Sequence, residues 1–110
     1  MKAAEALKSL HGSHYDVGTS LEINNSTGGG ISKDWAFDFG IPYSYTIELR
    51  PDNRPDELIP FCGLSHACGF LLNPKEIKAT FEEFFAAFQV MAEHVTDEFN
   101  NALNAYKQQQ

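Results

Sequence analysis

Apolar residues recur at helical spacing through the last third of the chain, after Asn73 and Pro74. Intervals of three and four residues separate Ile77, Phe81, Phe84, Phe88, Met91, Val95, Phe99 and Leu103. This spacing predicts an amphipathic helix over about residues 74–106, with its apolar stripe packed against a sheet. Asn73 is expected to cap the helix and Pro74 to lie in its first turn. Residues 107–110 are expected to fray.

Residues 42–50 show the clearest alternation of apolar and polar positions in the chain. Tyr43, Tyr45, Ile47 and Leu49 fall on one side of the alternation, and Ser44, Thr46 and Glu48 fall on the other. A period of two predicts a β-strand here. The prolines and charged residues of the next segment, 51–60, predict a surface loop.

The first third of the chain carries weaker signals. Residues 2–10 have Ala, Glu and Leu at helical spacing, and Gly12 is placed to end a helix there. Residues 15–32 are expected to be extended or irregular and then to form a glycine-containing loop. Asp34 is expected to cap a short aromatic turn of helix that follows.

Length and charge limit the class of protein. A chain of 110 residues is one domain or a piece of a larger one. The net charge is −7 and the basic residues are scattered, which argues against nucleic acid or an anionic membrane as a partner. No apolar run reaches the roughly 20 residues of a transmembrane helix. The first 12 residues lack the apolar core of a signal peptide, so an internal fragment of a longer protein is expected.

The cysteines and histidines allow two interpretations. Cys62 and Cys68 are either a short disulfide of an oxidising compartment or two unrelated thiols. The spacing of His11 and His14 is also compatible with two metal ligands, which the cysteines would complete as a tetrahedral zinc site. Five residues separate the two cysteines, more than structural zinc sites usually place between paired thiolates.

Glu48 has two interpretations as well. The alternation alone indicates a carboxylate on the polar side of a strand, paired with Arg50 or with a neighbouring strand. The order of several short segments changes this interpretation. They are His11-Gly12-Ser13-His14-Tyr15-Asp16-Val17-Gly18, Gly29-Gly30, Asp34-Trp35-Ala36-Phe37, Gly40 to Arg50 with Tyr43-Ser44 and Thr46 before Glu48-Leu49-Arg50, and Gly69-Phe70-Leu71-Leu72 before the terminal helix.

In this order the segments resemble the last third of A/B-type zinc carboxypeptidases, over about residues 3–96. The resemblance implies an α/β fold, a mixed sheet flanked by helices, to which this chain adds the strand at 42–50 and the long last helix. Residues 1–110 would then be part of a metallocarboxypeptidase domain, and residues 97–110 a helix extension with a frayed tail. An isolated sheet edge with an aromatic helix is expected to aggregate or to be partly ordered.

The resemblance also assigns chemistry. Glu48 matches the family's general base, which deprotonates a zinc-bound water and passes the proton to the leaving amine. The zinc ligands of the family, a His-x-x-Glu pair and a distant histidine, do not occur in this chain. The chain alone is therefore expected to bind no catalytic zinc and to be inactive. A non-catalytic binding protein derived from the family is the alternative.

Three further residues are assigned to substrate binding by the same resemblance. Lys33 falls at the floor of the family's specificity pocket, where its ammonium would favour an acidic C-terminal side chain. Thr46 precedes Glu48 on the same side of the predicted strand. The family has a tyrosine on its mobile loop where this chain has Asn25, or Ser26 when counted back from Asp34. The expected substrate is the C-terminus of a peptide, and the expected location is extracellular, as in the family.

Overall fold

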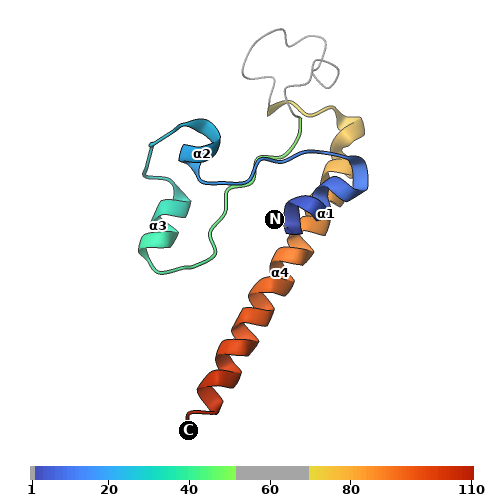
Figure 1. The fold of residues 1–110 in the computed structure, drawn as a ribbon. Helices are drawn as coiled ribbons and strands as arrows, with labels where there is room; N and C mark the ends of the chain where they lie inside the picture. The colour runs from blue at the N-terminus through green and yellow to red at the C-terminus, as the bar shows by residue number, and fades with distance from the viewer. Residues whose placement is uncertain (1, 52–69) are drawn as a thin grey trace.

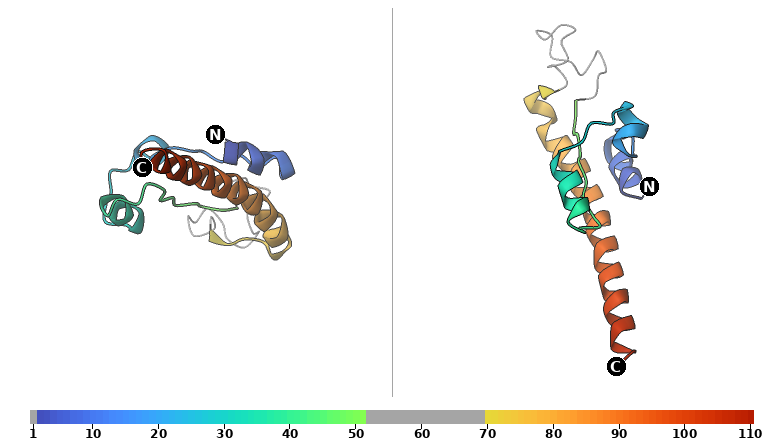
Figure 2. Two further views of the ribbon diagram at one scale, coloured as in Figure 1. Left: turned by 90° about the horizontal axis from the view of Figure 1, so that it is seen from below. Right: turned by 90° about the vertical axis from the view of Figure 1, so that its left-hand side faces the viewer.

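The computed structural model describes residues 2–51 and 70–110, and their regular structure is helical. The elements are α1 (Lys2–His11), α2 (Ser20–Asn24), α3 (Ser32–Asp38), the 3-10 turn η2 (Pro74–Glu76) and α4 (Ile77–Lys107). Helix α4 is by far the longest, and α1 lies against its first half (Figures 1 and 2). Helices α2 and α3 stand to one side of α4 and follow α1 in the chain (Figure 1).

The predicted long helix is confirmed, together with its cap. The Asn73 side chain accepts a hydrogen bond from the Lys75 N–H at 3.1 Å, and Pro74 opens η2. The α-helical hydrogen bonding then runs from Ile77 to Lys107. Asn satisfies a free N–H group of the first turn, and Pro has no N–H to leave unpaired, so both residue types start helices well.

The face of α4 that is buried differs from the predicted aromatic stripe. Ala87 is 3 % exposed and packs with Ala3 and Leu7 of α1. By contrast, Phe81 is 59 % exposed and Phe99 is 66 % exposed. Helix α1 is short and meets α4 along the band that contains small side chains, where two helix axes can approach closely. The prediction that the stripe packs against a sheet was therefore wrong.

The predicted strand at 42–50 does not form, and the α/β expectation is contradicted. Residues 43–49 carry no strand assignment, and no sheet exists within residues 2–51 and 70–110. Alternation reports only which side chains share a face, whereas a strand needs a neighbouring backbone to pair with. Within the described residues, segment 42–50 makes its contacts with side chains of α4 and of the α1–α2 loop instead.

Segment 42–50 runs along α4 in the opposite direction. Tyr43 donates a hydrogen bond to Glu98, and Arg50 binds Glu83. The seven residue steps from Tyr43 to Arg50 span roughly 23 Å in a strand-like conformation, at about 3.3 Å per step. The helix between Glu83 and Glu98 rises about 22 Å, at 1.5 Å per residue. The two lengths are comparable, so a non-helical segment of this length can reach both contacts on α4.

The shorter helices follow local signals. Helix α1 ends as predicted, with Gly12 at φ +77° and its N–H bonded to the Lys8 carbonyl at 2.9 Å. Helix α3 starts one turn before the expected position, because Asp34 lies inside its first turn and accepts from the Ile31 N–H at 3.3 Å.

Helix α2 falls in the stretch that was expected to be extended or irregular. A capping box supports it: the Thr19 N–H donates to the Glu22 carboxylate at 2.7 Å, and the Glu22 N–H donates to the Thr19 hydroxyl at 3.3 Å. The backbone bond and the hydroxyl bond from Thr19 hold the pKa of Glu22 below its usual value of 4.5.

Candidate active-site cavity

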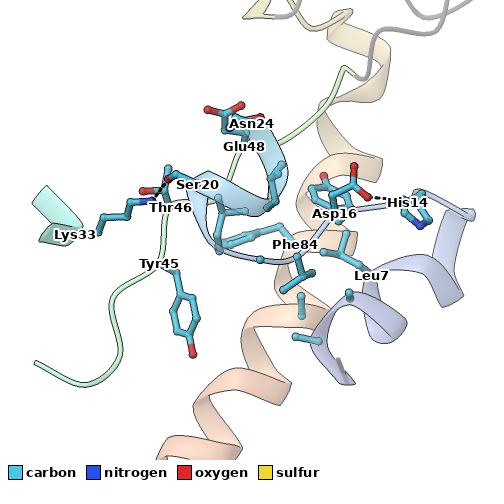
Figure 3. Close-up of a pocket in the computed structure, with 18 of the residues that line it drawn as sticks. Leu7, His14, Asp16, Ser20, Asn24, Lys33, Tyr45, Thr46, Glu48 and Phe84 are labelled. Atoms are coloured by element: carbon cyan, nitrogen blue, oxygen red, sulfur yellow. Dashed lines mark hydrogen bonds and ion pairs between the residues drawn. The ribbon is translucent and has the colours of Figure 1, made fainter. Parts of the chain in front are cut away.

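A cavity of about 660 Å³ lies between the α1–α2 loop, helices α2 and α3, segment 45–50 and the inner side of α4 (Figure 3). Glu48, Thr46 and Lys33 all line this cavity. These are three of the four residues that the resemblance assigned to catalysis or substrate binding. They come from two different segments, so the folded chain brings together what the sequence separates.

Glu48 presents an accessible carboxylate to the cavity. Its side chain is exposed, and among the described residues it makes no hydrogen bond or ion pair. The partner suggested by the alternation, Arg50, binds Glu83 and Glu76 instead. A carboxylate that is open to solvent on a cavity wall can accept a proton from a water molecule or from a bound ligand.

Lys33 is half-buried on α3 and extends toward α2, where its ammonium donates a hydrogen bond to the Ser20 hydroxyl (Figure 3). The hydroxyl oxygen that accepts this bond carries no charge, and within residues 2–51 and 70–110 no carboxylate forms an ion pair with Lys33. The cavity wall therefore carries a cation from α3 and an anion, Glu48, from segment 45–50. Such a wall suits a ligand with separated charges.

Asn25 is not part of the cavity wall. It ends α2 in the left-handed conformation, at φ 50°, and its N–H donates to the Leu21 carbonyl at 3.1 Å. Asparagine tolerates this backbone conformation better than most residues. Its neighbours Asn24 and Ser26 line the cavity instead, and Ser26 is the other position to which the loop tyrosine was aligned.

His11 and His14 face different carboxylates. His11 Nε2 lies 3.5 Å from Glu82 on α4, whereas His14 Nδ1 lies 3.7 Å from Asp16 at the cavity wall. Cys62 and Cys68 lie outside the described residues, so the disulfide and the four-ligand zinc site remain predictions.

The described part of the chain does not fit a catalytic zinc ion. Within residues 2–51 and 70–110, no group of three or more His, Cys, Asp or Glu side chains is arranged to hold a metal. The resemblance assigned the zinc ligands to sequence that this chain does not contain. In the same part of the chain, no helix combines the length and apolarity needed to span a membrane.

A buried ion pair joins the cavity wall to α4, and the sequence reasoning missed it. Glu83 is fully buried on α4, and Arg50 donates to both of its oxygens, from Nε to Oε2 at 3.0 Å and from Nη2 to Oε1. Ser13 donates to Oε1 at 2.8 Å, and Arg50 also reaches Glu76 at 2.9 Å. The signal was that Glu83 shares a helix face with Thr80 and Ala87, at intervals of three and four residues, on the side without aromatic residues.

A second contact holds the beginning of segment 42–50. Tyr43 donates from its hydroxyl to Glu98, and its ring meets His94 edge-on with centroids 6.1 Å apart. Glu98 also pairs with His94, one turn earlier on α4, at 3.4 Å. The bond to Glu98 stabilises the protonated phenol and raises the pKa of Tyr43 above its usual 10.0.

Comparison with known proteins places the chain among relatives of one family. The family model described as zinc carboxypeptidase matches residues 1–87. The chain is 40% identical over 98 residues to carboxypeptidase O of Bos taurus, covering 89% of the chain and 22% of that protein. It is 41% identical over 96 residues to carboxypeptidase A2 of Rattus norvegicus, covering 87% of the chain and 20% of that protein. Human carboxypeptidase B is 40% identical over 91 residues, covering 83% of the chain and 18% of that protein.

The chain thus spans about a fifth of the length of these relatives. No solved structure matches it. The family match covers well over half of the chain and includes the segments that carry Glu48, Thr46 and Lys33. The chain therefore belongs to the zinc carboxypeptidase family.

Proposed function

We propose that this chain is the C-terminal part of a metallocarboxypeptidase that removes the last residue of a peptide, with Glu48 as its general base. Glu48 would take a proton from the water that attacks the scissile carbonyl. When the C–N bond breaks, it would return that proton to the leaving amine. The observation that carries the proposal is the open carboxylate of Glu48 on a cavity wall shared with Lys33 and Thr46.

The chain alone is proposed to be inactive, because its described residues hold no metal-binding group. Metal analysis of the purified chain should find no stoichiometric zinc. An assay with C-terminally blocked and unblocked peptides should find no release of terminal residues. Turnover that accompanies stoichiometric zinc would contradict this part of the proposal.

The role of Glu48 is tested in a chimera, in which this chain replaces the matched segment of rat carboxypeptidase A2. Glu48→Gln should lower kcat by about 10²–10⁴-fold, the usual contribution of general acid–base catalysis. Glu5→Gln on α1 is the matched control, since Glu5 is exposed and does not line the cavity. If Glu48→Gln and Glu5→Gln have equal activity, Glu48 is not the base.

Lys33 is proposed to select an acidic C-terminal side chain. Support comes from its half-buried ammonium at the cavity wall, bonded to a neutral hydroxyl. The chimera should cleave a C-terminal Glu faster than a C-terminal Lys, and Lys33→Gln should reduce that preference. Lys78→Gln, at an exposed position on α4, should leave the preference unchanged. A parent chimera that prefers C-terminal Lys would contradict this assignment.

An extracellular location and a Cys62–Cys68 disulfide complete the proposal. Disulfides persist in oxidising compartments, and the two cysteines are close enough in sequence to form a short loop. Alkylation of the chain before and after reduction, followed by mass measurement, decides between a disulfide and two thiols. Two alkylated cysteines without reduction would exclude the disulfide.

A binding protein without catalysis is the second candidate. It is supported by the exposed aromatic side chains of α3, with Trp35 63 % and Phe37 77 % exposed. Such side chains are common at protein interfaces. In this case a peptide C-terminus would bind the chimera equally well before and after Glu48→Gln, and neither protein would release its last residue.

A further inference from the structure

Segment 42–50 is attached to the rest of the molecule mainly at its two ends. Tyr43 binds Glu98, and Arg50 binds Glu83. Between these ends, residues 44–49 make no hydrogen bond with the described part of the chain, through either backbone or side chain. Neither helix nor sheet therefore fixes the backbone around Glu48.

The two attachments differ in strength. The Tyr43 contact is exposed, whereas the Arg50 side chain is 9 % exposed and that of Glu83 is fully buried. The Arg50 guanidinium is planar and meets both oxygens of Glu83, so it fixes orientation as well as distance. Ser13 bonds to both partners, with Arg50 Nη2 donating to its hydroxyl at 2.6 Å. The Arg50 end is thus tied to α4 and to the α1–α2 loop together.

The two attachments lie on either side of Glu48. Both Tyr43 and Arg50 are bound to side chains of α4, so together they limit how far the residues between them can move. Glu48 is two residues from the buried end and shares the cavity wall with Arg50. If the Arg50 contacts were lost, the remaining hydrogen bond of this segment within the described residues would be that of Tyr43. Position 48 would then lie five flexible residues from that attachment, a separation of roughly 12 Å r.m.s..

We propose that Arg50 is a positioning residue for Glu48: its ion pair with Glu83 holds the extended segment along α4 and keeps the carboxylate at the cavity wall. The positional claim stands on contacts alone, and its catalytic meaning rests on the proposed function of Glu48. Arg50 acts through the placement of Glu48, and no contact of Arg50 with substrate is implied.

Pulsed electron resonance tests the proposal directly. Nitroxide labels are attached at Glu48→Cys and at Lys78→Cys, an exposed position on α4, after Cys62 and Cys68 are changed to Ser. In the otherwise unchanged chain the distance distribution should be narrow. If the distances between positions 48 and 78 were already broadly distributed in that chain, while its α1–α4 packing was intact, the proposal would be overturned.

The informative variant is the double substitution Arg50→Met with Glu83→Met. A buried ion pair can often be replaced by apolar residues of similar volume without loss of stability. This variant should keep the thermal unfolding midpoint and a narrow distance between labels at Lys8→Cys and Lys78→Cys on α1 and α4. The distribution of distances between positions 48 and 78 should broaden to a width of roughly 10 Å, as expected for a released segment. A narrow distribution from position 48 in this folded variant would refute the positioning role.

Two single variants sharpen the result. Glu76→Gln removes a partner of Arg50 that is 44 % exposed, and it should leave the distribution narrow. Arg50→Lys keeps the charge but loses the planar two-bond contact, so it should give an intermediate width. If the Arg50→Lys variant gave a distance distribution as narrow as that of the parent chain, the positive charge alone would hold the segment. The part of the proposal that rests on the planar two-bond contact would then be wrong.

The outcomes separate this inference from the proposed function. Label distances do not depend on catalysis, so Glu48→Gln with full activity in the chimera would refute the catalytic role and leave the positional claim intact. In the chimera, the double Met variant should lower kcat more than it changes KM, because a displaced base affects the chemical step more than binding. An unchanged kcat together with a broadened distribution would show that Glu48 needs no fixed position.

Discussion

Glu83 is fully buried, and Arg50 donates to both of its carboxylate oxygens. The two residues are 33 positions apart in the sequence, one beside the cavity and the other on the inner face of α4. A buried carboxylate is costly unless a cation and further hydrogen bonds satisfy it, and here Arg50 and Ser13 supply both. Removing one partner alone would therefore leave the other charge buried and without its counter-charge.

Glu83→Gln should destabilise the chain by about 3–5 kcal/mol, because it leaves the guanidinium of Arg50 buried without its main counter-charge. Urea unfolding followed by circular dichroism measures the change. Glu76→Gln is the matched control and should cost less than about 1 kcal/mol, since Glu76 is half-exposed. If both variants lost the same free energy of unfolding, the burial of Glu83 would not explain how much its ion pair with Arg50 stabilises the chain.

Leu7→Ala should cost about 2–3 kcal/mol, at the lower end for a buried leucine, because the core shared by α1 and α4 is small. Leu7 is 5 % exposed and packs against Ala87. Leu10→Ala, at a half-exposed position on the same helix, should cost less than about 0.5 kcal/mol. The same urea experiment compares the two variants. If Leu7→Ala and Leu10→Ala lost the same free energy of unfolding, Leu7 would not be the residue through which α1 packs on α4.

The capping box of α2 should respond to acid. The pKa of Glu22 is lowered from 4.5 in the folded chain by its bonds to Thr19, so its contribution is fully present above pH 4.5. It should be lost as the pH falls through the lowered folded pKa. Carboxyl carbon resonances would show Glu22 titrating below 4.5, together with the Thr19 amide. Thr19→Ala should move that titration back toward 4.5.

The Tyr43 contact should respond to alkali. Its pKa is raised from 10.0, first by the bond to Glu98, so the contact is fully present below pH 10.0. It should be lost as the pH rises through the raised folded pKa. Tyrosinate absorbance should show one late-titrating phenol that Tyr43→Phe removes. Glu98→Gln should return that titration toward 10.0, and an unchanged curve would contradict the bond.

Local features of the fold could be predicted from the sequence, and long-range ones could not. Asn73, Pro74 and Gly12 mark helix ends through bonds within a few residues, so α1 and α4 were found. The capping box at Thr19 and Glu22 was an equally local signal for α2 and was overlooked. The alternation of residues 42–50 said nothing of a partner backbone, and the predicted strand was wrong.

The candidate site shows the same division. Pattern alone made Glu48 a surface carboxylate, and only its resemblance to a family linked it with Lys33 and Thr46, which the fold then placed around one cavity. Asn25 was assigned by counting along a loop, and the turn that ends α2 places it outside the wall. No local period could reveal the pairing of Arg50 with Glu83, because their contact exists only after folding.

Trp35 gives α3 an optical reporter. It is the single tryptophan of the chain, its ring is stacked on Phe39 with centroids 5.2 Å apart, and it is 63 % exposed. Indole in contact with water emits at longer wavelengths than indole in an apolar contact. Any partner that covers α3, two residues from Lys33, would therefore shift the emission to shorter wavelengths and shield it from soluble quenchers. The natural fluorescence of the chain can thus follow the occupancy of this surface without a label.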